Sequence, residues 1–450
     1  MPKLIPVRPA LVAVAAGAAM AAVLASAGPV GAAVHPGKVH GAAASSFTDW
    51  PMFRGNDQRN GYSPETAIST ATASSLTATW TKTLGNQSYT SPVVATSATL
   101  NEALVYADAN NKLFAYPVTG GKAAWIYTYT GGTVEDSPTV SDGVVYFGLT
   151  DGTMYALDAS TGAVLCSFDT GDPILGSPVV VSDLDGSGPV IYDGTIPGDA
   201  GEGSEWAIYG PGNTHGSCTK DWQFTDFATP GGSWASPAYA TDATGEPLIV
   251  FGSKDTDDSV YAVDASTGAL VWSYKTSDVD ENDVGAPPDI SLPGNNGFAG
   301  GVVYVTGKDK TVYALDLTTG ALIWSYALTA GSNVSVGDVA GASLYGKVLY
   351  VPSDDGMYAL NAITGKLIWH VLPKSTFYSS PSITGPAGGR VLVAADIEGH
   401  IYVLNVTNGK TLWVKEPNSS GGFYSSPAIS QGGFFIASFN GVLRDYAPTS

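Results

Sequence analysis

The sequence predicts an all-β fold, an eight-bladed β-propeller of four-stranded antiparallel blades. The first reason is a motif, Ala-x-(Asp/Asn)-x-x-Thr-Gly-x-x-x-Trp, which is complete at residues 262–272, 314–324 and 359–369 and recurs in looser form elsewhere. A period in the forties to fifties of residues is typical of one supersecondary unit used many times. The second reason is that β-branched runs alternate with turn residues in every repeat, and the third is the number of repeats.

Each repeat has the same order of strands. A Ser-Pro or similar pair opens the inner strand, as at residues 90–94, 136–140 and 379–383, and a β-branched strand follows, as at residues 143–147. A polar hairpin such as Asp151-Gly152 leads to a third strand, and a Thr-Gly turn leads to a fourth strand that ends at Trp. Hairpin turns of this kind indicate antiparallel pairing. Proline at the start of the inner strand removes only a hydrogen bond that the inner edge would not make.

The outer strand and the opening of the inner strand each occur eight times in the sequence. Outer strands end at Trp80, Trp125, Cys166, Trp222, Trp272, Trp324, Trp369 and Trp413. Inner strands open at Pro92, Pro138, Pro178, Pro237, Pro287, near Val336, Pro381 and Pro427. The first outer strand, residues 76–82, precedes every inner strand, whereas the last repeat ends at Tyr446 without a Trp strand. We expect the N-terminal strand to complete the last blade, because this leaves no free sheet edge. Seven blades is the alternative if the long third repeat is irregular.

The Trp motif is interpreted as structural. Its Asp or Asn caps the turn, its Gly supplies a positive φ, and its Trp packs over the turn and the neighbouring blade. Where Cys166 replaces Trp, we expect this contact to be weaker.

The charge balance excludes two classes of partner. The 40 acidic and 20 basic residues give a net charge of -20. Such a surface repels phosphate backbones and anionic lipid, so binding of nucleic acid or adhesion to membranes is not expected.

The N-terminus predicts export. Lys3 and Arg8 precede an apolar run at residues 10–25, and small residues offer cleavage after Ala27 or Ala33. This is the pattern of a signal peptide, assigned to residues 1–33, with an uncleaved membrane anchor as the alternative. Residues 34–48 are predicted to be a disordered spacer and residues 49–450 the propeller. No Cys follows the apolar run, so no lipid anchor is expected. The mature protein is therefore predicted to be secreted and extracellular, without membrane insertion.

The metal- and redox-active residue types are few. The two cysteines, Cys166 and Cys218, fall in the outer strands of consecutive repeats. Two interpretations of the pair stay open, a disulfide and two buried thiols. Their spacing excludes haem attachment through a Cys-x-x-Cys-His motif. The five histidines lack the spacing of zinc ligands.

The repeated motif, the Ser-Pro openings and the segment DWPMFRGNDQRNGYS at residues 49–63 resemble the pyrroloquinoline-quinone (PQQ) repeat family. The resemblance covers roughly residues 49–446 and implies a propeller. It is compatible with two classes of function. The family includes quinoprotein dehydrogenases that bind PQQ with calcium, and non-catalytic propellers such as the outer-membrane-assembly lipoprotein scaffold.

Two stretches resemble dehydrogenases of the polyvinyl-alcohol type. Residues 278–288 resemble their acidic segment, and residues 307–316 their Lys-bearing hairpin. The resemblance implies that Asp283 is a candidate catalytic base and that Lys308 contacts the quinone. The alternative is a polar loop and an ordinary hairpin lysine. Vicinal cysteines and a haem motif are absent, so electron delivery would need a separate partner.

The loops before the inner strands should converge at one mouth of the central channel. They carry aromatic and acidic residues, namely Tyr89, Glu135, Asp136, Trp234, Asp283, Phe377, Tyr378, Phe423 and Tyr424. Aromatic faces beside carboxylates suit a stacked planar cofactor or sugar ring, although rings that simply close the channel are the alternative. Trp234 offers the largest platform. The candidate binding residues are Trp234, Lys308, Tyr89, Glu135, Tyr378 and Tyr424.

The loop at residues 182–188 resembles the first half of a calcium loop. Asp183, Asp185 and Ser187 stand at alternate positions, where oxygen ligands can surround a hard cation. Its twelfth position is Gly194 instead of an acid, so a plain Asp-Gly hairpin is the alternative.

Two functions therefore remain. The first is a secreted, non-catalytic binding or scaffold module for a protein or carbohydrate partner. The alternative is a PQQ- and calcium-dependent alcohol or sugar dehydrogenase. Whether PQQ is bound, and which ligand or partner is used, stays open.

Overall fold

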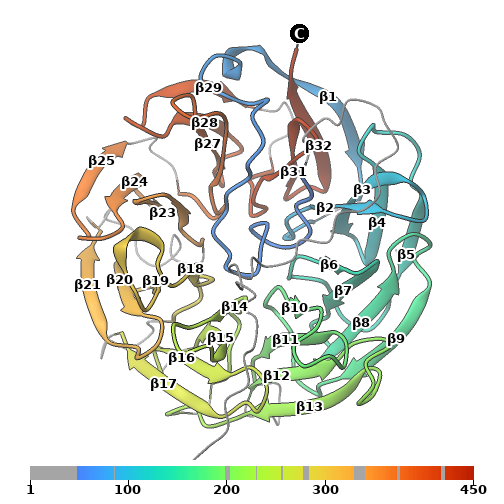
Figure 1. Ribbon diagram of the computed structural model, residues 1–450. Coiled ribbons are helices and arrows are strands. Elements are labelled where there is room, and N and C mark those ends of the chain that lie inside the picture. Colours follow the sequence, from blue (N-terminus) through green and yellow to red (C-terminus); the bar gives the residue numbers. More distant parts are fainter. Residues whose placement is uncertain are drawn as a thin grey trace, which may run out of the picture. The chain divides into compact units, whose positions relative to one another are not determined.

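Eight four-stranded antiparallel sheets, which we call blades 1 to 8, surround a central axis in the computed structural model (Figure 1). The structure describes residues 48–85, 87–197, 203–229, 231–254, 257–276, 283–328, 340–371, 376–416 and 421–449. The predicted eight-bladed fold is confirmed, and the seven-bladed alternative is wrong because the long third repeat forms a regular sheet. Among the described residues no helix is long and apolar enough to cross a membrane.

The strands of each blade are given from the inner to the outer one. The first four blades are β2 (Val93–Ser97), β3 (Glu102–Ala109), β4 (Lys112–Pro117), β5 (Trp125–Thr128); β6 (Thr139–Ser141), β7 (Val144–Gly148), β8 (Thr153–Asp158), β9 (Val164–Asp169); β10 (Val179–Val181), β11 (Val190–Thr195), β12 (Ser204–Tyr209), β13 (Thr219–Phe224); and β14 (Ala238–Thr241), β15 (Pro247–Gly252), β16 (Ser259–Asp264), β17 (Leu270–Lys275).

The other four blades follow the same order. They are β18 (Asp289–Ser291), β19 (Val302–Gly307), β20 (Thr311–Asp316), β21 (Leu322–Ala327); β22 (Ser343–Tyr345), β23 (Val348–Ser353), β24 (Gly356–Asn361), β25 (Leu367–Val371); β26 (Ser382–Thr384), β27 (Val391–Ala395), β28 (Ile401–Asn405), β29 (Thr411–Lys415); and β30 (Ala428–Ser430), β31 (Gly433–Ser438), β32 (Val442–Pro448), β1 (Leu76–Thr83). Two short 3-10 helices, Ala73–Ser75 and Asn295–Gly297, complete the described elements.

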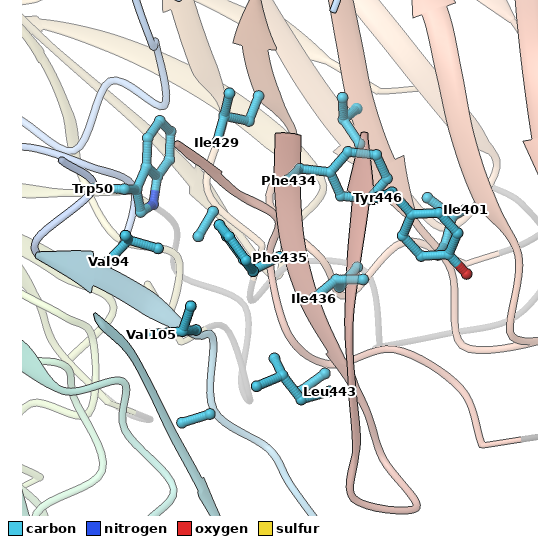
Figure 2. Packing of buried hydrophobic residues seen from close by; sticks show 14 of the residues in the cluster. Trp50, Val94, Val105, Ile401, Ile429, Phe434, Phe435, Ile436, Leu443 and Tyr446 are labelled. Carbon is cyan, nitrogen blue, oxygen red and sulfur yellow. The ribbon is translucent and has the colours of Figure 1, made fainter. Parts of the chain in front are cut away.

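The N-terminal strand closes the ring, as predicted. β1 pairs antiparallel with β32, from Leu76 opposite Pro448 to Thr83 opposite Val442. Figure 2 shows Phe434, Phe435 and Tyr446 of blade 8 within one buried cluster that also contains Trp50 and Val94. The two distant ends of the propeller are thus joined by both strand pairing and a shared core.

The Trp motif is a contact between neighbouring blades. The indole N–H donates to a backbone carbonyl of the next blade at 2.8–3.0 Å in six blades, by Trp80, Trp125, Trp222, Trp272, Trp324 and Trp369. The glycine of the next Thr-Gly turn lies against the indole. At Gly268, for example, an added Cβ would lie 2.7 Å from Trp222. The motif therefore needs glycine for close approach as well as for its positive φ.

A disulfide replaces this contact between blades 2 and 3. Cys166, which stands where the other blades carry Trp, is bonded to Cys218, and their Cα atoms are 5.9 Å apart. Cys218 lies one residue before β13 and not within the outer strand, where the sequence suggested it. The expected weaker contact is therefore a covalent cross-link.

Residues 48–65, which we call the plug segment, cross the central channel (Figure 1). The segment exchanges two 2.8 Å backbone hydrogen bonds between Trp50 and Val94 of blade 1. Its carbonyl groups accept backbone hydrogen bonds from the inner strands of blades 2, 4, 5, 6 and 7, at Val140, Tyr239, Ile290, Leu344 and Ile383. The inner edges of these six blades, for which the sequence suggested no pairing, therefore form backbone hydrogen bonds with the plug segment.

Side chains connect the plug segment to the remaining two blades. The buried Arg59 guanidinium donates to the carbonyls of Ser177 and Pro178 in blade 3, at 2.8 and 3.0 Å. Ser430 of blade 8 donates to the carbonyl of Thr48 at 2.6 Å. One short segment thus touches all eight blades.

The sixth inner strand begins later than predicted. It was expected near Val336, but β22 begins at Ser343. The usual signal is absent, because Gly341-Ala342 stands where most repeats carry Ser-Pro. Val336, the predicted signal peptide and the predicted spacer up to residue 47 lie outside the described residues.

Candidate functional site

A cavity of about 390 Å³ lies at one end of the channel and contains all six candidate binding residues. Its lining consists of Phe53, Tyr89, Ser91, Glu135, Ser137, Leu175, Ser177, Trp234, Ser236, Gly285, Pro287, Lys308, Tyr378, Ser380, Tyr424 and Ser426. We call this cavity the cup. Its volume falls in the range of about 300–1,000 Å³ that is usual for small-molecule sites.

Blade topology places these residues together. Tyr89, Glu135, Trp234, Tyr378 and Tyr424 each lie just before an inner strand, in loops that return from the outer strand of the preceding blade. All such loops meet at the same end of the axis, as the sequence predicted. The plug segment pairs with the inner strands farther along, and its Phe53 faces the cup. The plug segment therefore closes the channel beneath the cup.

A belt of serines surrounds the cup. In successive blades the backbone N–H of one opening residue donates to the hydroxyl of the next serine, at 2.8–2.9 Å. The belt runs from Gly341 through Ser380, Ser426, Ser91, Ser137 and Ser177 to Ser236. It is interrupted in blade 5, where Ala286 replaces serine. These hydrogen bonds between blades explain the serine of the Ser-Pro motif. The sequence alone accounted only for the proline.

The belt leaves hydrogen-bond donors in the cup. Each of the six serine oxygens already accepts a backbone N–H, and within the described residues none of these hydroxyls donates to another protein atom. A hydroxyl can both accept and donate. The cup therefore offers O–H donors to the acceptor oxygens of a ligand.

Trp234 and Lys308 form one side of the cup. The Lys308 ammonium lies 5.2 Å from the centre of the Trp234 ring, a cation–π distance, and also contacts the Asp283 carboxylate. The Lys308 backbone N–H donates to the Asp283 carbonyl at 3.1 Å. Asp283 is buried and is not part of the cup lining. The two residues singled out by resemblance are thus joined in an ion pair.

Glycine at position 285 is required by the indole. A Cβ atom added at Gly285 would lie 2.5 Å from Trp234 Cζ2, which is closer than real contacts allow. The Trp234 indole N–H is buried and, among the described residues, has no hydrogen-bond partner. The sequence did not point to Gly285, because its role depends on a contact across blades.

Tyrosines and a phenylalanine form the rim opposite. Tyr424 lies 5.5 Å from Tyr89, 5.1 Å from Tyr378 and 5.3 Å from Phe439, measured between ring centres. Desolvation, with Glu135 and Tyr424 nearby, raises the pKa of Tyr89, so its hydroxyl stays protonated. Phe439 lies in the hairpin after β31, where the sequence predicted no rim residue.

Three other predicted mouth residues point into the protein. Phe377 and Phe423 are fully buried at 0% exposure, and Asp136 is 2% exposed. The Asp136 carboxylate accepts the Gly148 N–H at 2.9 Å. The reason is alternation: along each loop, the residue next to the one facing the cup packs between blades.

The loop with Asp183, Asp185 and Ser187 lies between β10 and β11, at the end of the inner strand away from the cup. Asp183 accepts the Gly186 N–H at 2.6 Å, and Asp185 accepts the Ser187 N–H at 3.0 Å. The hydrogen bonds from the Ser187 hydroxyl and N–H lower the pKa of Asp185. Among the described residues no group of three or more His, Cys, Asp or Glu side chains could hold a metal ion. Calcium binding here stays a prediction.

The chain matches the model of one protein family. The model, described as outer membrane protein assembly factor BamB, matches residues 67–199 and 256–449.

The curated relatives have low sequence identity. Tetrathionate hydrolase of Acidithiobacillus ferrooxidans is 24% identical over 225 residues, which cover 47% of this chain and 41% of that protein. Quinohemoprotein alcohol dehydrogenase ADH IIB of Pseudomonas putida is 27% identical over 315 residues, covering 58% and 45%. BamB of Yersinia pestis is 23% identical over 318 residues, covering 68% and 69%. The matches span less than half the length of the first two proteins.

Solved structures share the fold. A europium-containing methanol dehydrogenase has a TM-score of 0.72 at 16% identity, covering 89% of this chain and 98% of that chain. BamB from Moraxella catarrhalis has a TM-score of 0.61 at 18% identity, covering 83% and 99%. At such identities the likeness concerns the fold alone, and one fold carries many functions.

Proposed function

This chain belongs to the PQQ-like repeat β-propeller family, and on that premise we propose that it is a secreted, non-catalytic binding protein whose cup holds an uncharged saccharide. The family has both scaffold and dehydrogenase relatives, so the choice depends on the cup. The observation that carries the proposal is the combination, around one cavity of about 390 Å³, of the Trp234 indole face and the serine belt.

The chemistry of the cup suits a sugar ring. The indole and tyrosine faces can stack on the apolar C–H face of a pyranose. The serine hydroxyls donate to ring and hydroxyl oxygens, and the Glu135 carboxylate accepts from sugar hydroxyls. Lys308 is paired with Asp283, so the cup carries little net positive charge. An uncharged ligand loses less solvation free energy than a charged one when it enters such a site.

Export belongs to the same proposal. It is supported by the basic and apolar N-terminal residues and by the Cys166–Cys218 disulfide, because disulfides persist in oxidising, extracytoplasmic compartments.

The dehydrogenase alternative has one observation in its favour, the Lys308–Asp283 pair beside Trp234. The described residues do not fit its cofactors. PQQ is a polyanion, whereas the charged residues of the cup lining are Glu135 and the already paired Lys308. A calcium ion beside it would also need ligands, and among the described residues no group of three or more His, Cys, Asp or Glu side chains stands at the cup to supply them.

The experiment is a comparison of ligands on the full chain. We would apply the purified protein to an array of neutral and acidic glycans, and separately titrate it with PQQ and calcium while measuring quinone absorbance and dye reduction with alcohols. The proposal expects retention on neutral glycans and no quinone band. A quinone band with dye reduction and a blank array would support the dehydrogenase instead.

A pair of alanine variants adds the control. Gly285→Ala should displace the Trp234 indole and abolish glycan retention, because the added Cβ would lie 2.5 Å from that ring. Gly121→Ala is the matched control, since its Cβ would meet only Pro117 at 3.8 Å. Equal retention by both variants would contradict a site at Trp234.

A further inference from the structure

A second cavity, of about 230 Å³, adjoins the cup and shares Tyr89 with it. It is lined by Gln87, Tyr89, Asp108, Asn110, Asn111, Tyr129, Thr133 and Val134. We call this cavity the side pocket. Tyr89 is 38% exposed and lines both cavities, so the cup and the side pocket meet at this side chain.

A fixed hairpin presents amides to the side pocket. Asn110 and Asn111 form the turn between β3 and β4 with φ of 55° and 59°, a left-handed conformation that asparagine tolerates. The Asn111 side-chain amide donates to the Gly132 carbonyl at 2.8 Å, which ties the hairpin to the loop before β6. Gln87 adds a third carboxamide. The hairpin wall is therefore held in place at Asn111, and the pocket is rich in paired donors and acceptors.

The base of the side pocket is polar, and burial keeps its one carboxyl group largely protonated at neutral pH. Tyr129 and Asp108 are each 3% exposed, and the tyrosine hydroxyl donates to the Asp108 carboxylate at 2.6 Å. Burial raises the pKa of Asp108 to about 8, although the Tyr129 hydrogen bond opposes this. No Lys, Arg or His lines the described pocket. Neither an anionic nor a cationic ligand finds a counter-charge there.

We propose that the side pocket is a subsite for a second, uncharged sugar unit of a saccharide whose first unit occupies the cup, with Tyr89 lying between the two. The inference rests on the proposed function and deepens it: the ligand is an oligosaccharide, and the hairpin of blade 1 selects for its length. Carboxamides and hydroxyls at fixed positions are suited to recognising the hydroxyl pattern of a pyranose.

The test measures affinity against chain length. Calorimetry with the full chain would use glucose, cellobiose and cellotriose, maltose and maltotriose, and N-acetylglucosamine with its β-1,4-linked dimer and trimer as probes. In one of these series we expect the disaccharide to bind at least about tenfold more tightly than the monosaccharide, as roughly one or two net hydrogen bonds would provide.

Variants assign that gain to the side pocket. Thr133→Phe fills it from its exposed rim, outside the cup, and should remove the gain while the monosaccharide affinity stays within about twofold of the parent. Thr99→Phe, the same change in the exposed turn between β2 and β3, is the matched control and should keep the gain. Asn110→Gly is a second variant that removes one carboxamide at a left-handed position where glycine is unstrained, and it should reduce the gain.

The outcomes separate the two proposals. Monosaccharide binding without a gain, or a gain that survives in both Thr133→Phe and Asn110→Gly, would overturn the side pocket and leave the cup intact. No binding by any probe in a protein that instead binds PQQ would overturn both.

Discussion

At the scale of single residues, the structure separates side chains that line the cup from those that hold blades together. Trp234 is half-buried, packs over Gly285 and faces the cup, whereas the Trp residues of the repeated motif each contact the next blade. The same residue type thus serves two purposes, and only its position in the blade distinguishes them.

Trp234→Ala tests this difference. Loss of a stacking platform should weaken saccharide binding by about 1–3 kcal/mol with little change in stability. A packed, structural indole would instead cost about 3–5 kcal/mol of unfolding free energy. Calorimetric titration and thermal melting of this variant measure the two effects, with Trp234→Phe as the control that keeps an aromatic face. A strongly destabilised Trp234→Ala protein would contradict the ligand site.

A second residue prediction concerns pH. The pKa of Asp108 is raised to about 8 by burial in the folded protein, whereas an Asp in an unfolded chain has a pKa of about 3.9. Its protonated form therefore stabilises the fold fully below pH 4, and this contribution is lost as the pH rises to about 8, by about 1.4 kcal/mol per unit. Asp108→Asn does not titrate, so its stability relative to the parent should increase with pH up to about 8 and then level off.

Denaturant unfolding at pH values between 5 and 9 measures that difference. The exposed Asp226→Asn serves as the control for the Asp-to-Asn substitution itself. A pH-independent difference between Asp108→Asn and the parent would mean that Asp108 is ionised in the folded protein.

At the scale of elements, local patterns predicted the blades well. Strand alternation and the Thr-Gly-to-Trp spacing are set within a single repeat, so they are visible in the sequence. The opening of the sixth inner strand was misplaced because Gly341-Ala342 replaces the Ser-Pro signal there. Within the loops, Phe377 and Tyr378 face opposite ways, and no sequence period fixes such a choice.

The disulfide between blades 2 and 3 should contribute more than any one indole contact. Cys166→Ser opens a cross-link between positions 52 apart, for which about 2–5 kcal/mol of stability is expected. Trp272→Phe removes one 2.8 Å hydrogen bond to Leu317 and should cost about 1–3 kcal/mol. Chemical denaturation compares the variants, and reductant should bring the parent to the level of Cys166→Ser. An unchanged midpoint in that variant would refute the role of the cross-link.

The loop between β10 and β11 carries the calcium prediction. Calcium titrated by calorimetry into chelator-treated protein should bind, and Asp185→Ala should weaken that binding because it removes one of the alternating oxygen ligands. Thr99→Phe, in another exposed turn, should bind as the parent does. Identical isotherms for the parent and Asp185→Ala would retire the site.

At the scale of the whole molecule, closure and the plug segment depend on contacts between residues far apart in sequence. The pairing of β1 with β32 was predictable, because a Trp strand was missing at one end and present at the other. The path of residues 48–65 was not predictable, because its backbone pairs with blades across the whole chain and no local sequence pattern indicates this. The same holds for the position of Gly285 beneath Trp234.

Removal of the closing strand tests the ring. Deletion of residues 76–82 would expose the edge of β32 and uncover the apolar face around Phe434 and Phe435, so we expect loss of cooperative unfolding and aggregation. Deletion of residues 34–46 is the control and should leave melting nearly unchanged. Parent-like calorimetric melting of the first deletion would contradict closure by β1.

Saccharide binding in the cup is tested most sharply by a crystal structure of the protein saturated with a neutral oligosaccharide that the array selects. We expect a sugar ring stacked on Trp234, with oxygens that accept from the serine belt, and a second unit beyond Tyr89 in the side pocket. A saccharide bound elsewhere on the molecule, with the cup empty of it, would refute both binding sites.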